Sequence, residues 1–310
     1  MVRVAEEWFA MCGGCEITIL DIGEPLLELL PRLEFVHMPV LMDHKVYGQK
    51  GEKKKMEIPD ADVGIISGGI RNEENRELAK EMRAKCKTLI ALGSCACYGG
   101  IPALTNQYKV NEIYDKVYRG SKTTDSGPTP QEGVPPLTDR VYAVDEVVNV
   151  DVYIPGCPTQ PEIVADALVS LLDGKPFSLP ERSVCDDCPT KREKKAVTYI
   201  KRPLESIGDP GKKLEETRCF MELGFLCLGP VTKSGCGGHE KIPRCIKGYM
   251  PCRSCFGPIR KGANPMVDMM GALSSIGLDP KLIPDRLATF QRYIGAHGRL
   301  RPLPVKIVYS

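Results

Sequence analysis

The sequence predicts an α/β protein with a parallel sheet in its first half and a second domain poor in regular structure. In the first half, short apolar runs alternate with helical patterns, which is the signature of strand-helix-strand units. From about residue 181 the composition changes, and cysteine, glycine and proline interrupt any periodicity. A chain of 310 residues is long enough for two cored domains. We therefore expect domains over residues 1–180 and 181–310.

Five apolar runs are the expected strands, at residues 2–9, 35–40, 63–67, 88–92 and 150–154. Amphipathic patterns predict helices at residues 17–30, 72–86 and 161–172, the last of which opens on proline. This order of elements resembles a flavodoxin-like fold. Two further helices are expected near the end of the chain, at residues 265–273 and 284–293.

Residues 105–145 are expected to form one long loop. The segments 120–130 and 132–136 are rich in glycine and proline, which cannot hold a helix or a central strand. Long insertions of this kind in a compact domain are most often disordered or functional. The sequence leaves open whether this one is a docking surface.

Charge and hydropathy exclude several classes of function. A net charge of +2 gives no support to binding of nucleic acid or of a membrane surface. No run approaches a transmembrane span, and the N-terminus has neither a basic region before an apolar stretch nor a twin-arginine pair. We therefore expect a cytoplasmic protein without nucleic-acid or membrane partners. Thiols seldom persist as disulfides in a reducing cytosol, so the 14 cysteines indicate metal binding.

Four cysteines follow expected strands, at the point where each strand ends. Cys12 and Cys15 follow the first strand, Cys95 the fourth and Cys157 the fifth. The carboxyl ends of parallel strands form one edge of a sheet, and open α/β sheets bind ligands in the crevice along that edge. The pair Gly68-Gly69 after the third strand would let backbone amides approach a bound group closely. We expect the four thiolates to converge on one site.

This set of cysteines has two other possible interpretations. Free cysteines are often buried core residues, but core cysteines need not gather at strand ends. A structural zinc site is the stronger rival, since Cys-x2-Cys pairs also bind zinc. Zinc sites usually draw on two close pairs, whereas here only Cys12 and Cys15 are close in sequence.

The second domain contains eight more candidate ligands: Cys185, Cys188, Cys219, Cys227, Cys236, Cys245, Cys252 and Cys255. This segment has too few apolar positions to fold by burial alone, so we expect inorganic clusters to act as its core. Spacing alone does not divide the eight between two sites. Twelve cysteines in three sets of four predict three cubane iron-sulfur clusters and a role in electron transfer.

The ordered motifs resemble those of the small subunit of nickel-iron hydrogenases, over residues 1 to about 260. They are Cys12-x2-Cys15, Gly93-Ser94-Cys95, Gly156-Cys157-Pro158 and Cys185-x2-Cys188. The resemblance implies a proximal cluster on the first set of four. It implies a medial cluster on Cys236, Cys245, Cys252 and Cys255, and a distal cluster on Cys185, Cys188, Cys219 and Cys227. Cys86 and Cys97 are left over.

Two departures from the exported members of that family are informative. Cys185 stands where those members place histidine, and Cys245 where many of them carry proline. The expectation is therefore three 4Fe-4S clusters with all-cysteine ligation. In this the chain is similar to the cytoplasmic hydrogenases of methanogens, most closely to the methyl-viologen-reducing type that serves heterodisulfide reductase. The corresponding subunit of a deazaflavin-reducing hydrogenase or a sulfhydrogenase is the alternative.

The resemblance also implies partners. A nickel-iron centre needs paired cysteines near both ends of one polypeptide, and residues 299–310 contain no cysteine. We therefore assign no catalytic residue to this chain and expect a large subunit to hold nickel and iron. A further iron-sulfur subunit leading to a heterodisulfide reductase-type complex is the expected acceptor. A non-redox zinc scaffold that only binds partners is the alternative from another class.

Three features beside the motifs have open roles. Glu16 could relay protons at a subunit interface or could stabilise the dipole of the helix that it opens. His239 could replace a cysteine ligand, but with so many cysteines we expect it to be exposed or outside the ligand shell. The basic run at residues 191–195 is expected to be a solvated face that could also orient an acidic partner.

Overall fold

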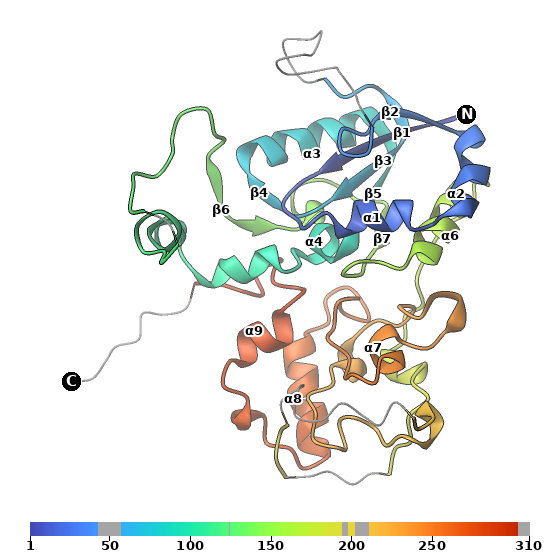
Figure 1. Ribbon diagram of the computed structural model, residues 1–310, viewed down its shortest axis with the longest axis vertical. Helices are drawn as coiled ribbons and strands as arrows, with labels where there is room; N and C mark the ends of the chain where they lie inside the picture. Colours follow the sequence, from blue (N-terminus) through green and yellow to red (C-terminus); the bar gives the residue numbers. More distant parts are fainter. Residues whose placement is uncertain (43–56, 124, 194–197, 202–210, 303–310) are drawn as a thin grey trace.

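The computed structural model describes residues 1–42, 57–123, 125–193, 198–201 and 211–302. Its main sheet has five parallel strands in the order β2-β1-β3-β5-β7 (Figure 1). The strands are β1 (Val2–Trp8), β2 (Leu33–His37), β3 (Ala61–Ser67), β5 (Cys86–Leu92) and β7 (Val152–Ile154). This order is that of doubly wound flavodoxin-like sheets. The predicted fold class and all five predicted strands are confirmed.

The strands end at one level. Trp8 pairs with Ser67, Ser67 with Leu92, and Leu92 with Ile154. The chain therefore leaves β1, β3, β5 and β7 along the same edge of the sheet. Segments that follow these strands become neighbours although they are far apart in the sequence.

Helices cover both faces of the sheet. One face of β1 and β3 packs through Val4 and Ile65 against α1 (Gly14–Leu20) and α6 (Pro161–Leu172). The other packs through Ala5 and Ile66 against α3 (Glu73–Lys85). Asn72 caps α3, because its side chain accepts a hydrogen bond from the Asn75 amide at 2.7 Å.

The single helix predicted over residues 17–30 is wrong. The chain forms α1, then α2 (Glu24–Leu29) and a 3₁₀ turn (Leu30–Arg32). Gly23 separates the two helices with φ of 71°, a left-handed conformation that glycine adopts without steric cost. Apolar spacing across the break looked continuous because both helices present apolar residues to the same core.

The expectation of one loop over residues 105–145 is also wrong in part. A 3₁₀ turn (Pro102–Gln107), α5 (Val110–Tyr114) and a π-helical turn (Asp115–Arg119) precede the glycine-rich part. Strand β6 (Leu137–Tyr142) follows it and pairs antiparallel with β4 (Ile70–Asn72). The glycine and proline signal was correct only for residues 120–136. β6 was missed because it is a strand of a two-stranded ribbon, where proline nearby is tolerated.

The C-terminal part is rich in loops and short turns, as expected. Its helices are α7 (Arg244–Lys247), α8 (Pro265–Ser275) and α9 (Arg286–Gln291), and the last two confirm the predicted terminal helices. It also has 3₁₀ turns at Val184–Asp186, Leu214–Glu216, Gly229–Val231, Gly238–Glu240 and Pro280–Leu282. Met269 and Phe290 bring α8 and α9 onto Leu228. The division into domains at residue 181 stays a prediction.

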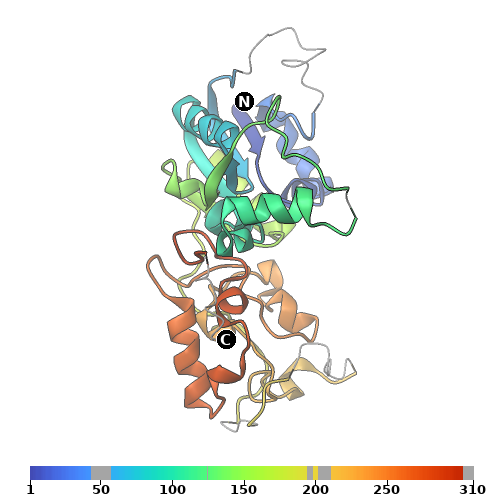
Figure 2. The same ribbon diagram turned by 90° about the vertical axis from the view of Figure 1, so that its left-hand side faces the viewer.

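The C-terminal part lies against the edge of the sheet where the strands end. Figures 1 and 2 show it, in orange to red, on the side of the sheet where α4 (Gly93–Tyr98) lies. The Gln160 side chain donates to the Cys236 carbonyl at 2.6 Å, and the Ala296 amide donates to the Tyr98 carbonyl at 3.0 Å. Ser94 donates through its hydroxyl to the Cys255 carbonyl.

Within the described ranges, none of the helices has the length and apolar character needed to cross a bilayer.

The close approach of β3 and β5 generates a test of the sheet. A methyl group on Gly64 would lie 2.6 Å from the Cys86 sulfur and 3.0 Å from Leu89 Cδ1. Gly64→Ala should therefore overpack the core, cost about 1–3 kcal/mol and lower the Tm measured by circular dichroism. Cys86→Ala should rescue part of that loss in the double variant. Gly271→Ala is the control, because an added methyl there meets nothing within 4 Å. Equal Tm values for Gly64→Ala and the double variant would contradict this packing.

Candidate functional site

The structure brings the first set of cysteines together at the carboxyl edge of the sheet. Cys12 lies in the turn after β1, Cys15 in α1, Cys95 in α4, and Cys157 after β7. Burial raises the pKa of Cys95 to about 12, and the charges of Cys157 and Cys12 add to the rise. The pKa of Cys15 is raised by burial and by its neighbours, which include the other three thiols. The four sulfurs therefore lie within electrostatic reach of one another.

Two glycines make room for these sulfurs. A Cβ on Gly93 would collide with the Cys15 sulfur, and a Cβ on Gly100 would collide with that of Cys95. Both glycines have positive φ, which other residues adopt only with strain. The Gly69 amide donates to the Ala10 carbonyl at 3.0 Å and is not free to approach a bound group. An approach by the Gly68 amide stays a prediction.

A buried pair of carboxyl groups lies behind Cys15. Glu16 in α1 and Glu6 in β1 are 1% and 0% exposed, and both accept from the Ser67 hydroxyl. Burial, together with the neighbouring charge of Glu16, raises the pKa of Glu6 to about 9. The second oxygen of each carboxyl group has no hydrogen-bond partner in the described part of the chain. Glu16 is thus in the first turn of α1, as expected, but it is buried.

Glu6 is the residue of this pair that sequence reasoning missed. Its signal was two adjacent acids, Glu6 and Glu7, in an otherwise apolar strand. Both are buried, and the Glu7 carboxylate lies 2.6 Å from His37 Nε2. A relay of protons through Glu16 stays a prediction.

A second group of cysteines lines a cavity of about 300 Å³ below α4. Its four members are Cys236, Cys245, Cys252 and Cys255, and Cys157 of the first set is also part of the wall. Burial raises the pKa of Cys255 to about 12, and the charges of Cys245, Cys236 and Cys157 add to the rise. Burial also raises the pKa of Cys252. This grouping is the one that the family resemblance implied for the medial set.

The remaining four cysteines form a third group that adjoins the second. Burial raises the pKa of Cys185 to about 12, with Cys219 and Cys188 contributing charge. Burial raises the pKa of Cys227 to about 12 as well, with contributions from Cys185 and Cys219. The Gly229 Cα lies close enough that a methyl group there would stand 3.1 Å from the Cys185 sulfur.

The three groups fit iron-sulfur clusters chemically. Each offers four thiols, the ligand type and number that a cubane uses. The second group encloses a space larger than one ion needs. Burial raises the pKa of several of these thiols, among them Cys15, Cys227 and Cys252, and favours their protonated form unless a positive charge is bound among them, which iron would supply. Among the described residues, no three histidine, cysteine, aspartate or glutamate side chains are arranged to hold a single metal ion.

The other residues named from the sequence are not members of these groups, although the charges of Cys15 and Cys95 act on Cys97. Cys86 caps α3 and opens β5, and it is buried. Cys97 is fully buried in α4 and its thiol donates to the Ala91 carbonyl at 3.3 Å. His239 is exposed and lies 2.9 Å from Asp166 through Nε2. Of the basic run, residues 194 and 195 lie outside the described residues.

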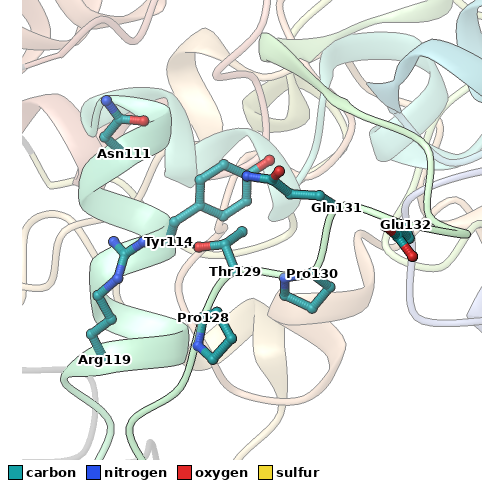
Figure 3. A pocket seen from close by; sticks show the side chains of 8 residues that line it. All are labelled: Asn111, Tyr114, Arg119, Pro128, Thr129, Pro130, Gln131 and Glu132. Carbon is teal, nitrogen blue, oxygen red and sulfur yellow. Dashed lines mark hydrogen bonds between the residues drawn. The ribbon is translucent and has the colours of Figure 1, made fainter.

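A separate cavity lies within the insertion before β6, far in sequence from the thiols. It measures about 690 Å³ and is lined by Asn111, Tyr114 and Arg119 from the helical segment and by residues 128–132 from the facing loop (Figure 3). Arg119 ties the two sides together by donating to the Thr129 hydroxyl at 3.2 Å. The segment expected to be a plain loop thus folds back on a helix.

Comparison with known proteins gives the family. Residues 12–171, about half of the chain, match the model described as "NADH ubiquinone oxidoreductase, 20 Kd subunit". One subunit of the F420-non-reducing hydrogenase of Methanocaldococcus jannaschii is 40% identical, with 94% of each chain covered. The corresponding subunit from Methanothermobacter thermautotrophicus is 38% identical, with 88% of this chain and 84% of the relative covered. The relative from Archaeoglobus profundus, 35% identical with 86% of each chain covered, is described as the iron-sulfur subunit of an F420-non-reducing hydrogenase.

Two solved hydrogenase structures contain chains that are similar to this one. A chain of an NAD+-reducing [NiFe]-hydrogenase in the H2-reduced state matches with a TM-score of 0.51 and 30% identity, covering 58% of this chain and 95% of that chain. A chain of the Dm. baculatum [NiFeSe]-hydrogenase shares the fold, with a TM-score of 0.50 at 17% identity over 84% of this chain and 96% of that chain. The protein therefore belongs to the family of F420-non-reducing hydrogenase iron-sulfur subunits, the small, electron-transfer subunits of nickel-iron hydrogenases.

Proposed function

We propose that this chain holds three 4Fe-4S clusters and passes electrons from a hydrogen-splitting large subunit to a heterodisulfide reductase-type acceptor. The single observation that carries the proposal is that each group of four thiols adjoins the next. The proposed ligands are the proximal, medial and distal sets in that order. When bound, such clusters supply one-electron redox chemistry. The chain's own residues hold them and exclude water.

The first and second groups are joined through α4 and through Cys157. Cys157 belongs to the first set and also lines the cavity of the second. Ser94, adjacent to Cys95, donates its hydroxyl to the Cys255 carbonyl and its amide to the Gly156 carbonyl at 2.8 Å. Ser94 is 1% exposed, so this link is shielded from water.

The second and third groups are joined by one direct contact. The Cys252 amide donates to the Cys227 sulfur at 3.3 Å, and both residues are buried. Hydrogen bonds to sulfur are among the features that set the reduction potential of such clusters. Phe220 and Ile246 pack around the same thiols and keep water out. The order of groups from the sheet edge outwards is therefore first, second, third.

The first group lies at a surface suited to a protein partner. Cys12 and Cys157 are exposed, and Trp8, Ile17 and Leu20 nearby in the sequence expose large apolar side chains. Clustered apolar exposure of this kind marks interaction sites. We propose that the large subunit with nickel and iron covers this edge. The relatives' names exclude F420 as their acceptor. We propose that a further iron-sulfur subunit and a heterodisulfide reductase-type complex dock at the third group. The cytoplasmic location stays a prediction.

The ligand assignment can be tested within one helix. Cys95→Ser should remove the proximal cluster and lower the content from about twelve iron atoms per chain to about eight, measured with sulfide after anaerobic purification. Cys97→Ser, two residues away in α4, is the matched control and should leave the iron content unchanged because its thiol contacts the Ala91 carbonyl. Zinc in place of iron, or equal iron losses in both variants, would contradict the assignment of Cys95 as a cluster ligand.

Cys245 allows a test by cluster type. It is the second residue of α7, where the amide needs no partner within the helix and proline is tolerated. Cys245→Pro should leave three cysteines in the medial set and yield a three-iron cluster. Electron paramagnetic resonance of the oxidised complex should show its signal. A four-iron cluster with unchanged spectra in this variant would mean that Cys245 is not a ligand.

The docking proposal predicts that the chain without its partner is inactive and that the large subunit contacts α1. The chain alone should neither take up nor evolve hydrogen, because no candidate nickel site is present in its sequence.

Leu20→Glu should weaken co-purification of the large subunit, because a carboxylate would enter the apolar contact. Val267→Glu in α8, at a similarly exposed position, should not. Cross-links from the large subunit to residues 211–227 rather than to α1 would reverse the proposed direction.

A further inference from the structure

The wall of the second cavity carries two arginines beside its thiols. Arg244 and Arg253 both line the space enclosed by Cys236, Cys245, Cys252 and Cys255, and no carboxylate is part of that lining. Arg253 lies between Cys252 and Ser254 in the sequence and is half-buried, whereas Arg244 opens α7 and is more exposed. The cavity is therefore a group of thiols facing two permanent cations.

Neither cation has an ion-pair partner among the described residues. In the part of the chain that the structure describes, no ion pair or side-chain hydrogen bond of Arg244 or Arg253 is found. Two other arginines near the thiols are paired: Arg182 lies 2.6 Å from Asp187, and Arg218 lies 3.4 Å from Glu222. Arg192, beside the third group, donates to the Cys185 carbonyl at 2.7 Å. A guanidinium without an ion-pair partner keeps its net charge towards the cavity, and solvent screens the half-buried Arg253 less than the exposed Arg244.

The surroundings of Tyr293 are a second indication that Arg253 lies near the thiols. Burial raises the pKa of Tyr293, the charges of Cys157 and Cys255 add to the rise, and Arg253 is among the cations that oppose it. The Tyr293 hydroxyl is therefore close enough to Cys157, Cys255 and Arg253 for the charges of all three to act on it.

Acids act on all three groups, and the acids near the second and third groups are paired with arginines. Cys15 of the first group is adjacent to Glu16, whose charge acts on it directly. In the third group, Glu222 acts on Cys219. Asp187 acts on Cys236 of the second group, and its own ion pair with Arg182 offsets that charge. The fixed charge of the side chains is therefore more positive around the second group than around the first.

We propose that Arg253, assisted by Arg244, raises the reduction potential of the cluster held by the second group above the value that the thiols alone would set. This inference rests on the proposed function. Reduction of a cluster adds one negative charge, and a nearby cation stabilises the reduced form more than the oxidised form. An electron that leaves the first group is then held at the second until the acceptor draws it through the third. Arg253 acts through its charge and is not a ligand.

The test is a redox titration of the anaerobically purified complex, followed by electron paramagnetic resonance. Arg253→Gln should shift the reduced-to-oxidised ratio of one cluster about tenfold towards the oxidised form at a fixed potential, a midpoint about 59 mV lower for one electron. Arg253→Lys keeps the charge and should restore most of the midpoint. Arg260→Gln, an exposed position outside the cavity, is the control and should shift nothing. The shifted signal should be the one that Cys245→Ser alters.

The outcomes separate the inference from the proposed function. A wild-type complex without iron at the second group would overturn the proposed function itself. Three clusters with an unshifted midpoint in Arg253→Gln, or equal shifts in the Gln and Lys variants, would overturn the role of the charge alone. If Arg253→Gln loses iron, Arg244→Gln is titrated in its place with the same expected direction, and an unchanged midpoint there overturns the inference.

Discussion

The parallel register of the sheet is the constraint on which the rest of the molecule depends. Because Trp8, Ser67, Leu92 and Ile154 end their strands at one level, the turns that follow them meet along one edge. That edge collects the four thiols of the first group, which are spread over half of the sequence, and also receives the C-terminal part of the chain. A shift in one strand would misplace a thiol and the contacts of Ser94 together.

The C-terminal part is organised by its thiols as much as by its apolar residues. Cys227 and Cys252 belong to the same buried cluster as Phe220, Phe225 and Ile246. Most of its backbone runs in loops and short turns, so few hydrogen bonds of regular structure hold it. Groups of buried thiols without a bound cation are a weak core, and metal binding is known to supply folding free energy in such small segments. Cluster insertion and folding of this part are therefore expected to be one process.

Local conformation explains where sequence reasoning about the fold failed. The apolar spacing of residues 17–30 is continuous across two helices, and only the left-handed φ of Gly23 separates them. Over residues 105–145, a glycine-rich stretch concealed the helical turns before it and strand β6 after it. In both cases the sequence pattern extends across the end of an element, and the conformation of a few residues sets where that element ends. Long periodic elements such as α3, α6 and α8 were predicted at nearly their full extent.

The sequence by itself determined the parallel α/β class, the strand ends that carry Cys12, Cys15, Cys95 and Cys157, and the family, because alternating patterns and ordered motifs are properties of the chain. Spacing could not divide the eight later cysteines, since loops of any shape satisfy it; the folded chain groups them by bringing residues such as Cys219 and Cys185 together. Only the tertiary structure revealed the buried Glu6 beside Glu16, the room made at Gly93, and the arginines of the second cavity. Burial, clearance and unpaired charge depend on what surrounds a residue in space, which no local pattern encodes.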